Sequence, residues 1–149
     1  MVIEQITLQN FRNFFDLVLD FSSGATILVG PNGVGKTNLL EAINLLSTGK
    51  SFRASVEKEM IKDDQNLTRI EGKISSNNAT KLDVIISNSE QLKGKRLLVS
   101  NVPKRLVDFA GILKTVLFVP EDMDLVTGPP GLRRRFLDSA LYQVDREYS

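Results

Sequence analysis

A glycine-rich run of eight residues carries the clearest chemistry in the sequence. Gly30, Gly35, Lys36 and Thr37 stand at the spacing of a phosphate-binding loop. Glycines allow backbone conformations that side chains forbid, so successive N–H groups can converge on phosphate oxygens. Lys36 is expected to reach the β- and γ-phosphates of a nucleotide, and the Thr37 hydroxyl to ligate Mg²⁺. The nucleotide-binding residues predicted from this run are Gly30, Pro31, Asn32, Gly33, Val34, Gly35, Lys36 and Thr37.

The segments on either side of the run fit this interpretation. Residues 25–29 form an apolar stretch typical of a buried strand that ends where the loop begins. After the loop, Leu39, Leu40, Ile43 and Leu46 recur at helical spacing, as expected for one face of a helix. A strand, a glycine loop and a helix N-terminus together place aligned backbone dipoles at a bound phosphate. The sequence therefore predicts an α/β phosphate-loop fold.

Composition excludes several classes of site. The chain has 149 residues, of which 42% are hydrophobic and 25% charged, as expected for a single globular domain. Nineteen basic and eighteen acidic residues leave a net charge of +1, so only local clusters can indicate a polyanionic partner. The absence of cysteine and histidine rules out disulfides, thiolate or imidazole metal ligands, and serine–histidine catalysis. No apolar run approaches the ~20 residues that span a bilayer, and we expect a cytoplasmic protein.

Alternating and apolar segments predict the remaining elements. Residues 75–78, Ser-Ser-Asn-Asn, predict a hairpin turn inside an antiparallel meander. A helix is expected after the Gly-Pro-Pro breaker at 128–130, running almost to Ser149. The predicted strands are residues 2–8, 16–21, 69–74, 82–87 and 96–99, with a further buried strand at 116–119.

A phosphate-binding loop alone does not hydrolyse ATP, because an acidic residue after an apolar strand usually organises the metal and the attacking water. The nearest candidate is residues 116–122, where Pro120 interrupts the junction before Glu121 and Asp122. One interpretation is a small self-contained phosphate-loop kinase or nucleotidase that uses Glu121 and Asp122 at the metal. The other is a core strand that leads into a loop near the nucleotide. A nucleotide-binding interaction module without turnover is a third possibility.

Five basic residues gather in a window that contains no acidic residue. They are Lys93, Lys95, Arg96, Lys104 and Arg105. Uncompensated positive charge at the edge of a meander can contact DNA backbone phosphates. A charge run is also commonly a solvated face, and no aromatic residue is interleaved here for base stacking. DNA contact is therefore a hypothesis that the residues alone leave open.

A series of short motifs, in order along the whole chain, resembles the RecF family. These bacterial proteins of recombination and replication repair are ATPases of the SMC and ABC type. The motifs are Asn10-Phe11-Arg12-Asn13, residues 30–37, Asn38-Leu39-Leu40-Glu41-Ala42, Ser51-Phe52-Arg53, residues 117–122, Gly128 and Arg133-Arg134-Arg135-Phe136-Leu137-Asp138. The phosphate loop is generic, whereas the combination of the other motifs is specific.

The resemblance implies a two-lobed ATPase head whose first lobe combines a mixed sheet with an antiparallel meander. The sequence contains neither the ABC signature motif nor an uninterrupted strand ending in Asp-Glu, which such heads carry in their second lobe. Residues 1–149 are therefore expected to be the N-terminal lobe of a longer protein. In such ATPases two heads enclose ATP between them, so we expect the full-length protein to be an ATPase and this chain to hydrolyse little.

The same resemblance implies a function. It indicates a nucleoid-associated ATP- and DNA-binding protein of recombinational repair, replication restart and the SOS response. ATP and Mg²⁺ would be its cofactors, and its partners would be DNA, a second copy of the full-length protein and other recombination-mediator proteins, with no membrane partner. It also implies that Arg12 reaches the phosphates of the nucleotide, to which an arginine is suited by its planar fork of donors.

Overall fold

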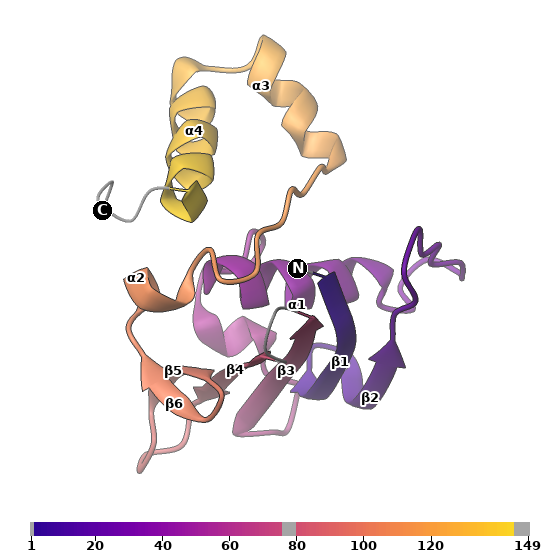
Figure 1. The fold of residues 1–149 in the computed structure, drawn as a ribbon, viewed down its shortest axis with the longest axis vertical. Helices are drawn as coiled ribbons and strands as arrows, with labels where there is room; N and C mark the ends of the chain where they lie inside the picture. Colours follow the sequence, from indigo (N-terminus) through magenta and orange to yellow (C-terminus); the bar gives the residue numbers. More distant parts are fainter. Residues whose placement is uncertain (1, 76–79, 145–149) are drawn as a thin grey trace.

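The computed structural model describes residues 2–75 and 80–144 and forms one sheet covered on one face by a helix (Figure 1). The predicted turn at residues 75–78 lies outside the described residues apart from Ser75, and so does the end of the last helix beyond Val144. Within the described chain the predicted β-meander and both longer helices are confirmed.

Six strands form the sheet in the order β2-β1-β3-β4-β5-β6, and every pairing among them is antiparallel. The strands are β1 (Val2–Phe11), β2 (Phe14–Asp20), β3 (Leu67–Ser75), β4 (Thr80–Ser87), β5 (Gly94–Val99) and β6 (Val102–Lys104). A two-residue turn, Arg12-Asn13, joins β1 to β2, and Phe11 pairs with Phe14 across it. This turn brings the N-terminal hairpin against the glycine-rich loop.

Strand β3 shows why the sheet has one apolar and one charged face. Successive side chains of a strand point to opposite faces. Ile70 and Ile74 are buried in the core, whereas Arg69 and Glu71 lie on the other face. There Arg69 forms an ion pair with the buried carboxylate of Asp83 on β4, at 2.6 Å between Nη2 and Oδ1. The core consequently lies between the apolar face and the helix above it.

Helix α1 (Lys36–Thr48) covers that apolar face directly after the glycine-rich loop. Its buried apolar side chains are Leu39, Ala42, Leu45 and Leu46. The prediction that Leu40 shares the buried face is wrong, since the residue is 41% exposed. Leu40 lies about 100° around the helix from Leu39 and points away from the centre of the stripe.

Short helices and one long helix complete the chain. They are η1 (Glu57–Met60), α2 (Leu106–Phe109), η2 (Pro120–Met123), α3 (Asp124–Thr127) and α4 (Pro130–Val144). Figure 1 shows α3 and α4 on the side of α1 that faces away from the sheet. A groove of about 780 Å³ lies between this pair and α1, with Phe52, Val116 and Phe136 in its lining.

Two of the predicted buried strands are wrong. Residues 25–29 and 116–119 have no strand pairing. Leu28, Leu117 and Val119 are half-buried, whereas the large side chains between them face outward. Ile27 is 83% exposed, Val29 89% and Val116 97%. An apolar run indicates that a segment becomes buried, but it does not indicate which residues bury it. The described residues supply no strand alongside either segment.

Gly72 on β3 tests how closely α1 packs on the sheet. A Cβ at Gly72 would lie 2.6 Å from Leu46 Cδ1, a side chain of the buried helix face. Gly72→Ala should therefore reduce the free energy of unfolding by about 1–3 kcal/mol through overpacking. Gly131→Ala on α4 is the matched control, because an added Cβ there meets no atom within 4 Å. Chemical denaturation of both variants measures the difference, and equal stability would contradict the close packing.

Candidate nucleotide site

The glycine-rich loop has one open side and one closed side. Gly33 and Gly35 have positive φ angles of 84° and 112°, which L side chains rarely adopt. A Cβ at Gly33 would meet no atom within 4 Å, so this side of the loop is open. A Cβ at Gly35 would lie 2.5 Å from Phe14 Cζ and 2.9 Å from Asn13 Oδ1. The loop therefore rests against the β1–β2 turn and presents its other side to solvent.

The N-terminus of α1 begins inside this loop and is free of competing side chains. Its N-cap residue is Gly35, which has no side chain to bond the first-turn N–H groups, and no acidic residue occupies the first turn. Those N–H groups and the helix dipole together attract an anion. The open side at Gly33 and this uncapped helix end fit a nucleotide phosphate.

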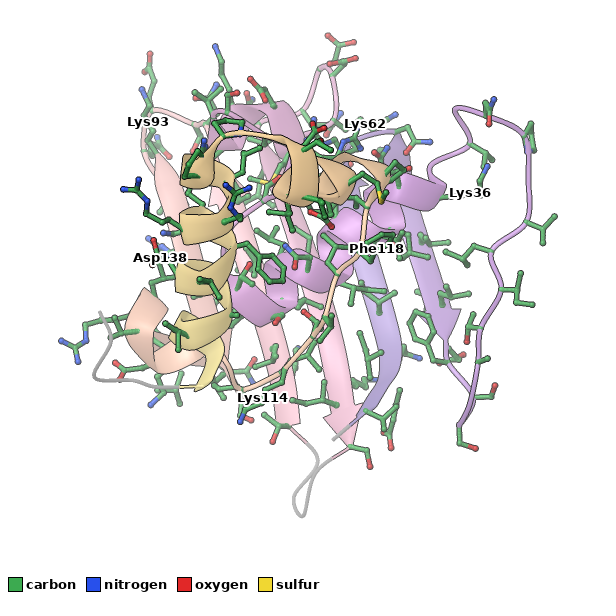
Figure 2. The ribbon with its side chains drawn as sticks, turned by 90° about the horizontal axis from the view of Figure 1, so that it is seen from above. Lys36, Lys62, Lys93, Lys114, Phe118 and Asp138 are labelled. Atoms are coloured by element: carbon green, nitrogen blue, oxygen red, sulfur yellow. The ribbon has the colours of Figure 1, made fainter. Side chains whose placement is uncertain are left out.

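Lys36 and Thr37 lie at the start of α1, as the sequence predicts (Figure 2). The Lys36 ammonium donates hydrogen bonds to the carbonyl oxygens of Gly30 and Pro31, at 2.7 and 2.8 Å. The lysine is thus folded over the loop that precedes it. Thr37 is exposed, so its hydroxyl is accessible to a metal ion held beside the phosphates. The two residue types suit ATP and Mg²⁺.

Arg12 lies in the β1–β2 turn with a positive φ of 53° and makes an extensive ion pair. Its Nε and Nη2 donate to the two carboxylate oxygens of Glu41 at 2.9 and 2.6 Å, and its Nη1 donates to the carbonyl of Glu59 at 2.7 Å. In this structure Arg12 therefore connects its turn to α1 and η1.

Glu41 is the functional-site residue that sequence reasoning missed. Its side chain is fully buried on α1 and bonds residues from two other segments. Besides Arg12, the Ser51 hydroxyl donates to Glu41 Oε1 at 2.5 Å, and Arg53 Nη1 lies 3.8 Å from Oε2. A charge next to the apolar stripe of a predicted helix was the available signal, because a buried carboxylate needs partners.

The acidic candidates beyond Pro120 lie in the short helix η2. Asp122 Oδ2 accepts a hydrogen bond from the Val119 backbone N–H at 2.8 Å, which stabilises the start of η2. The side chain of Glu121 lies outside the described residues. Across the described residues no cluster of three or more acidic side chains could hold a metal ion.

The structure does not place all five basic residues of the predicted DNA contact on one face of the sheet. Lys95 pairs with Glu57 at 2.5 Å, and Arg105 pairs with Asp108 at 3.1 Å. Arg96 follows Lys95 on β5 and so points to the opposite face of the sheet. Lys93 precedes β5 and lies far from Lys36 (Figure 2). Lys104 is exposed on β6, opposite Leu97.

No described helix is both long enough and apolar enough to cross a membrane.

The Arg12–Glu41 pair should dominate the stability of this region. Glu41→Gln leaves the Arg12 guanidinium without its counter-charge, and breaking a buried pair in this way costs about 3 kcal/mol or more. The low end applies because 19% of the Arg12 side chain remains exposed. Asp108→Asn is the control, since it removes an exposed ion pair with Arg105 and should change stability by less than about 1 kcal/mol. Urea denaturation measures the free energy of unfolding of both variants. A similar loss in both would contradict a stabilising role of the buried Arg12–Glu41 pair.

Sequence relatives agree with the resemblance seen in the motifs. The chain is 40% identical to the DNA replication and repair protein RecF of Bacillus pumilus over 150 residues, which is 99% of this chain and 40% of that protein. The Bacillus subtilis protein of the same name is 39% identical with the same coverage. The predicted resemblance to RecF is confirmed, and the chain spans about 40% of the length of these relatives.

A solved structure has the same arrangement of elements. The recombination mediator protein RecF-ATPrS of the RecFOR pathway matches with a TM-score of 0.91 and 32% identity, over 99% of this chain and 40% of that chain. The predicted α/β fold of the ABC and SMC head type is confirmed.

A family model gives the assignment. The model for the AAA ATPase domain matches residues 1–108, which is well over half of the chain. The matched part includes the β1–β2 turn, the glycine-rich loop, α1 and the meander. The chain belongs to the AAA ATPase domain family.

Proposed function

We propose that this chain binds ATP with Mg²⁺ through residues 30–37, as the nucleotide-binding part of a DNA-repair ATPase of the RecF type. The observation that carries the proposal is the open side of the loop at Gly33 next to the uncapped N-terminus of α1. Both features present backbone N–H groups to an anion. The 40% identity to a RecF protein supports the biological setting.

Each residue of the loop has a separate role in this proposal. Backbone N–H groups of Asn32, Gly33, Val34 and Gly35 surround the phosphates, since glycine conformations aim them inward. Lys36 neutralises charge on the β- and γ-phosphates, and the Thr37 hydroxyl ligates Mg²⁺. Bound Mg²⁺ neutralises the negative charge of the phosphate oxygens.

Arg12 contributes to phosphate binding without leaving Glu41. A guanidinium has five N–H donors in a fixed plane. Three of them bond Glu41 and Glu59 in this structure. The remaining donors on Nη1 and Nη2 are available to a phosphate oxygen, and Glu41 holds their plane in place.

Residues 1–149 constitute the N-terminal lobe of a larger ATPase head in this proposal. The exposed apolar side chains of Ile27, Val29, Val116 and Phe118 support it, because exposed apolar surface of this kind usually marks an interaction site. Strands from the rest of a longer protein would cover them. ATP hydrolysis and ATP-dependent pairing of two heads then belong to the longer protein, and this chain alone hydrolyses little ATP.

DNA is the proposed macromolecular partner. The proposed processes are recombinational repair and replication restart, as part of the SOS response. The proposed location is the bacterial cytoplasm, at the nucleoid. Other recombination-mediator proteins are further proposed partners. Lys93, Arg96, Lys104 and Arg105 are exposed, whereas Lys95 is half-buried. Lys95 and Arg105 already have carboxylate partners. The self-contained kinase or nucleotidase is less favoured, because Asp122 already bonds a backbone N–H of its own turn.

Lys36→Ala tests the nucleotide proposal. The variant should lose measurable ATP binding in isothermal titration calorimetry, because it removes the positive charge that faces the β- and γ-phosphates. Lys114→Ala is the control, since Lys114 is an exposed lysine far from the loop (Figure 2). It should bind ATP like the parent chain, and unchanged affinity in Lys36→Ala would refute the proposed site.

The DNA proposal predicts a salt-dependent interaction with backbone phosphates. Neutralising Lys93 and Arg96 together should weaken binding equally for different DNA sequences. The slope of the logarithm of the DNA-binding constant against the logarithm of the salt concentration should also become less steep, by about 1 for each phosphate that the variant no longer neutralises. Lys95→Gln is the control and should have a smaller effect, because Glu57 already neutralises Lys95. Fluorescence anisotropy with ATP present provides the measurement. A sequence-dependent decrease would indicate base contacts instead, and unchanged binding would indicate a solvated face.

A further inference from the structure

The Asn13 side chain forms a bridge between the glycine-rich loop and α1. Its Nδ2 donates a hydrogen bond to the Val34 carbonyl at 3.0 Å, and its Oδ1 accepts one from Asn38 Nδ2 at 2.9 Å. Val34 precedes the last glycine of the loop, and Asn38 lies in the first turn of α1. One carboxamide thus contacts both sides of the junction at which the loop becomes helix.

The chemistry of this bridge requires an asparagine. One atom of the side chain must donate to a carbonyl, and another must accept from an amide N–H. Aspartate accepts but cannot donate, and alanine does neither. Turning the amide over would place its two N–H donors against the N–H donors of Asn38, so the network itself determines the orientation.

Two basic side chains hold the bridge in position through hydrogen bonds. Lys62 Nζ donates to the Asn13 carbonyl at 3.1 Å, and Arg53 Nη1 donates to Asn38 Oδ1 at 2.8 Å. The Asn13 amide also lies against Gly35, where an added Cβ would be 2.9 Å from Oδ1 and 3.0 Å from Nδ2. The bridge therefore supports the closed side of the loop, opposite the open side at Gly33.

We propose that Asn13 is a positioning residue that sets the affinity of the loop for nucleotide phosphates by holding the Val34 carbonyl. Rotating the Val34–Gly35 peptide would turn the Gly35 N–H together with the carbonyl, because both belong to one planar unit. Holding the carbonyl from behind thus keeps the Gly35 N–H in place for a phosphate. This inference rests on the proposed function of the loop in ATP binding.

The test measures ATP affinity of the full 149-residue chain, with Mg²⁺ present, by isothermal titration calorimetry. Asn13→Ala should raise the Kd about five- to tenfold, the effect expected from removing one neutral hydrogen bond that orders the site. Asn13→Asp keeps the size and the bond from Asn38 but cannot donate to Val34, and it should weaken binding at least as much. If Asn13→Ala does not fold, the ATP affinity of Asn13→Asp alone tests the positioning role.

Two controls separate positioning from general stability. Asn88→Ala removes an exposed asparagine outside the loop and should leave the Kd unchanged. Gly72→Ala lowers stability between β3 and α1 without touching the loop, and it should also leave the Kd unchanged when measured below its melting temperature. A melting temperature lowered by Asn13→Ala or Asn13→Asp with parental ATP affinity would show a merely structural role and overturn the proposal.

The outcomes also distinguish this inference from the proposed function. If the parent chain binds ATP and Asn13→Ala and Asn13→Asp bind it equally well, the positioning role is wrong and the nucleotide site remains. If the parent chain itself binds no ATP, the proposed function fails and the inference fails with it.

Discussion

The rest of the site depends on the ion pair between Arg12 and the fully buried carboxylate of Glu41. A buried charge is tolerated only when it is paired and hydrogen-bonded. Its partners come from the β1–β2 turn and from the segment after α1, through Arg12 and Ser51. Helix α1 therefore cannot rotate or slide without separating these groups. Since the glycine-rich loop leads directly into α1, the position of the loop is fixed by the same carboxylate.

Both residues of the β1–β2 turn help to hold the glycine-rich loop in place. Arg12 holds the helix through Glu41, and Asn13 holds the loop through the Val34 carbonyl. The turn contains two residues, and Phe11 and Phe14 on either side of it pair across the hairpin. Its side chains consequently have little freedom to move independently of the sheet. A rigid hairpin thus supports a glycine-rich segment whose own backbone has few intrinsic restraints.

Sequence reasoning succeeded where the information is local and failed where it is not. The loop, α1 and the meander follow from residue spacing within one segment, and all three are present. Segments 25–29 and 116–119 were predicted as buried strands because apolar runs indicate burial, yet no described strand pairs with either segment, and Ile27 and Val116 remain exposed. The partner of Arg12 could not be found by spacing, since Glu41 lies 29 residues further along the chain. Asn13 belonged to a recognised motif, but which loop carbonyl it bonds is visible only in three dimensions.

The ammonium of Lys36 contacts two backbone carbonyls of the loop, and these contacts bear on the proposed binding of phosphate. This ammonium satisfies the carbonyls of Gly30 and Pro31, so neither the charge nor these oxygens lack a partner. A phosphate oxygen carries more negative charge than a carbonyl, and charge-assisted hydrogen bonds are roughly twice as strong as neutral ones. In the proposed function, an anion that enters from the Gly33 side would therefore compete with weaker acceptors for the same lysine. The closed side need not move in this exchange, because Asn13 and Phe14 already support Gly35 from behind.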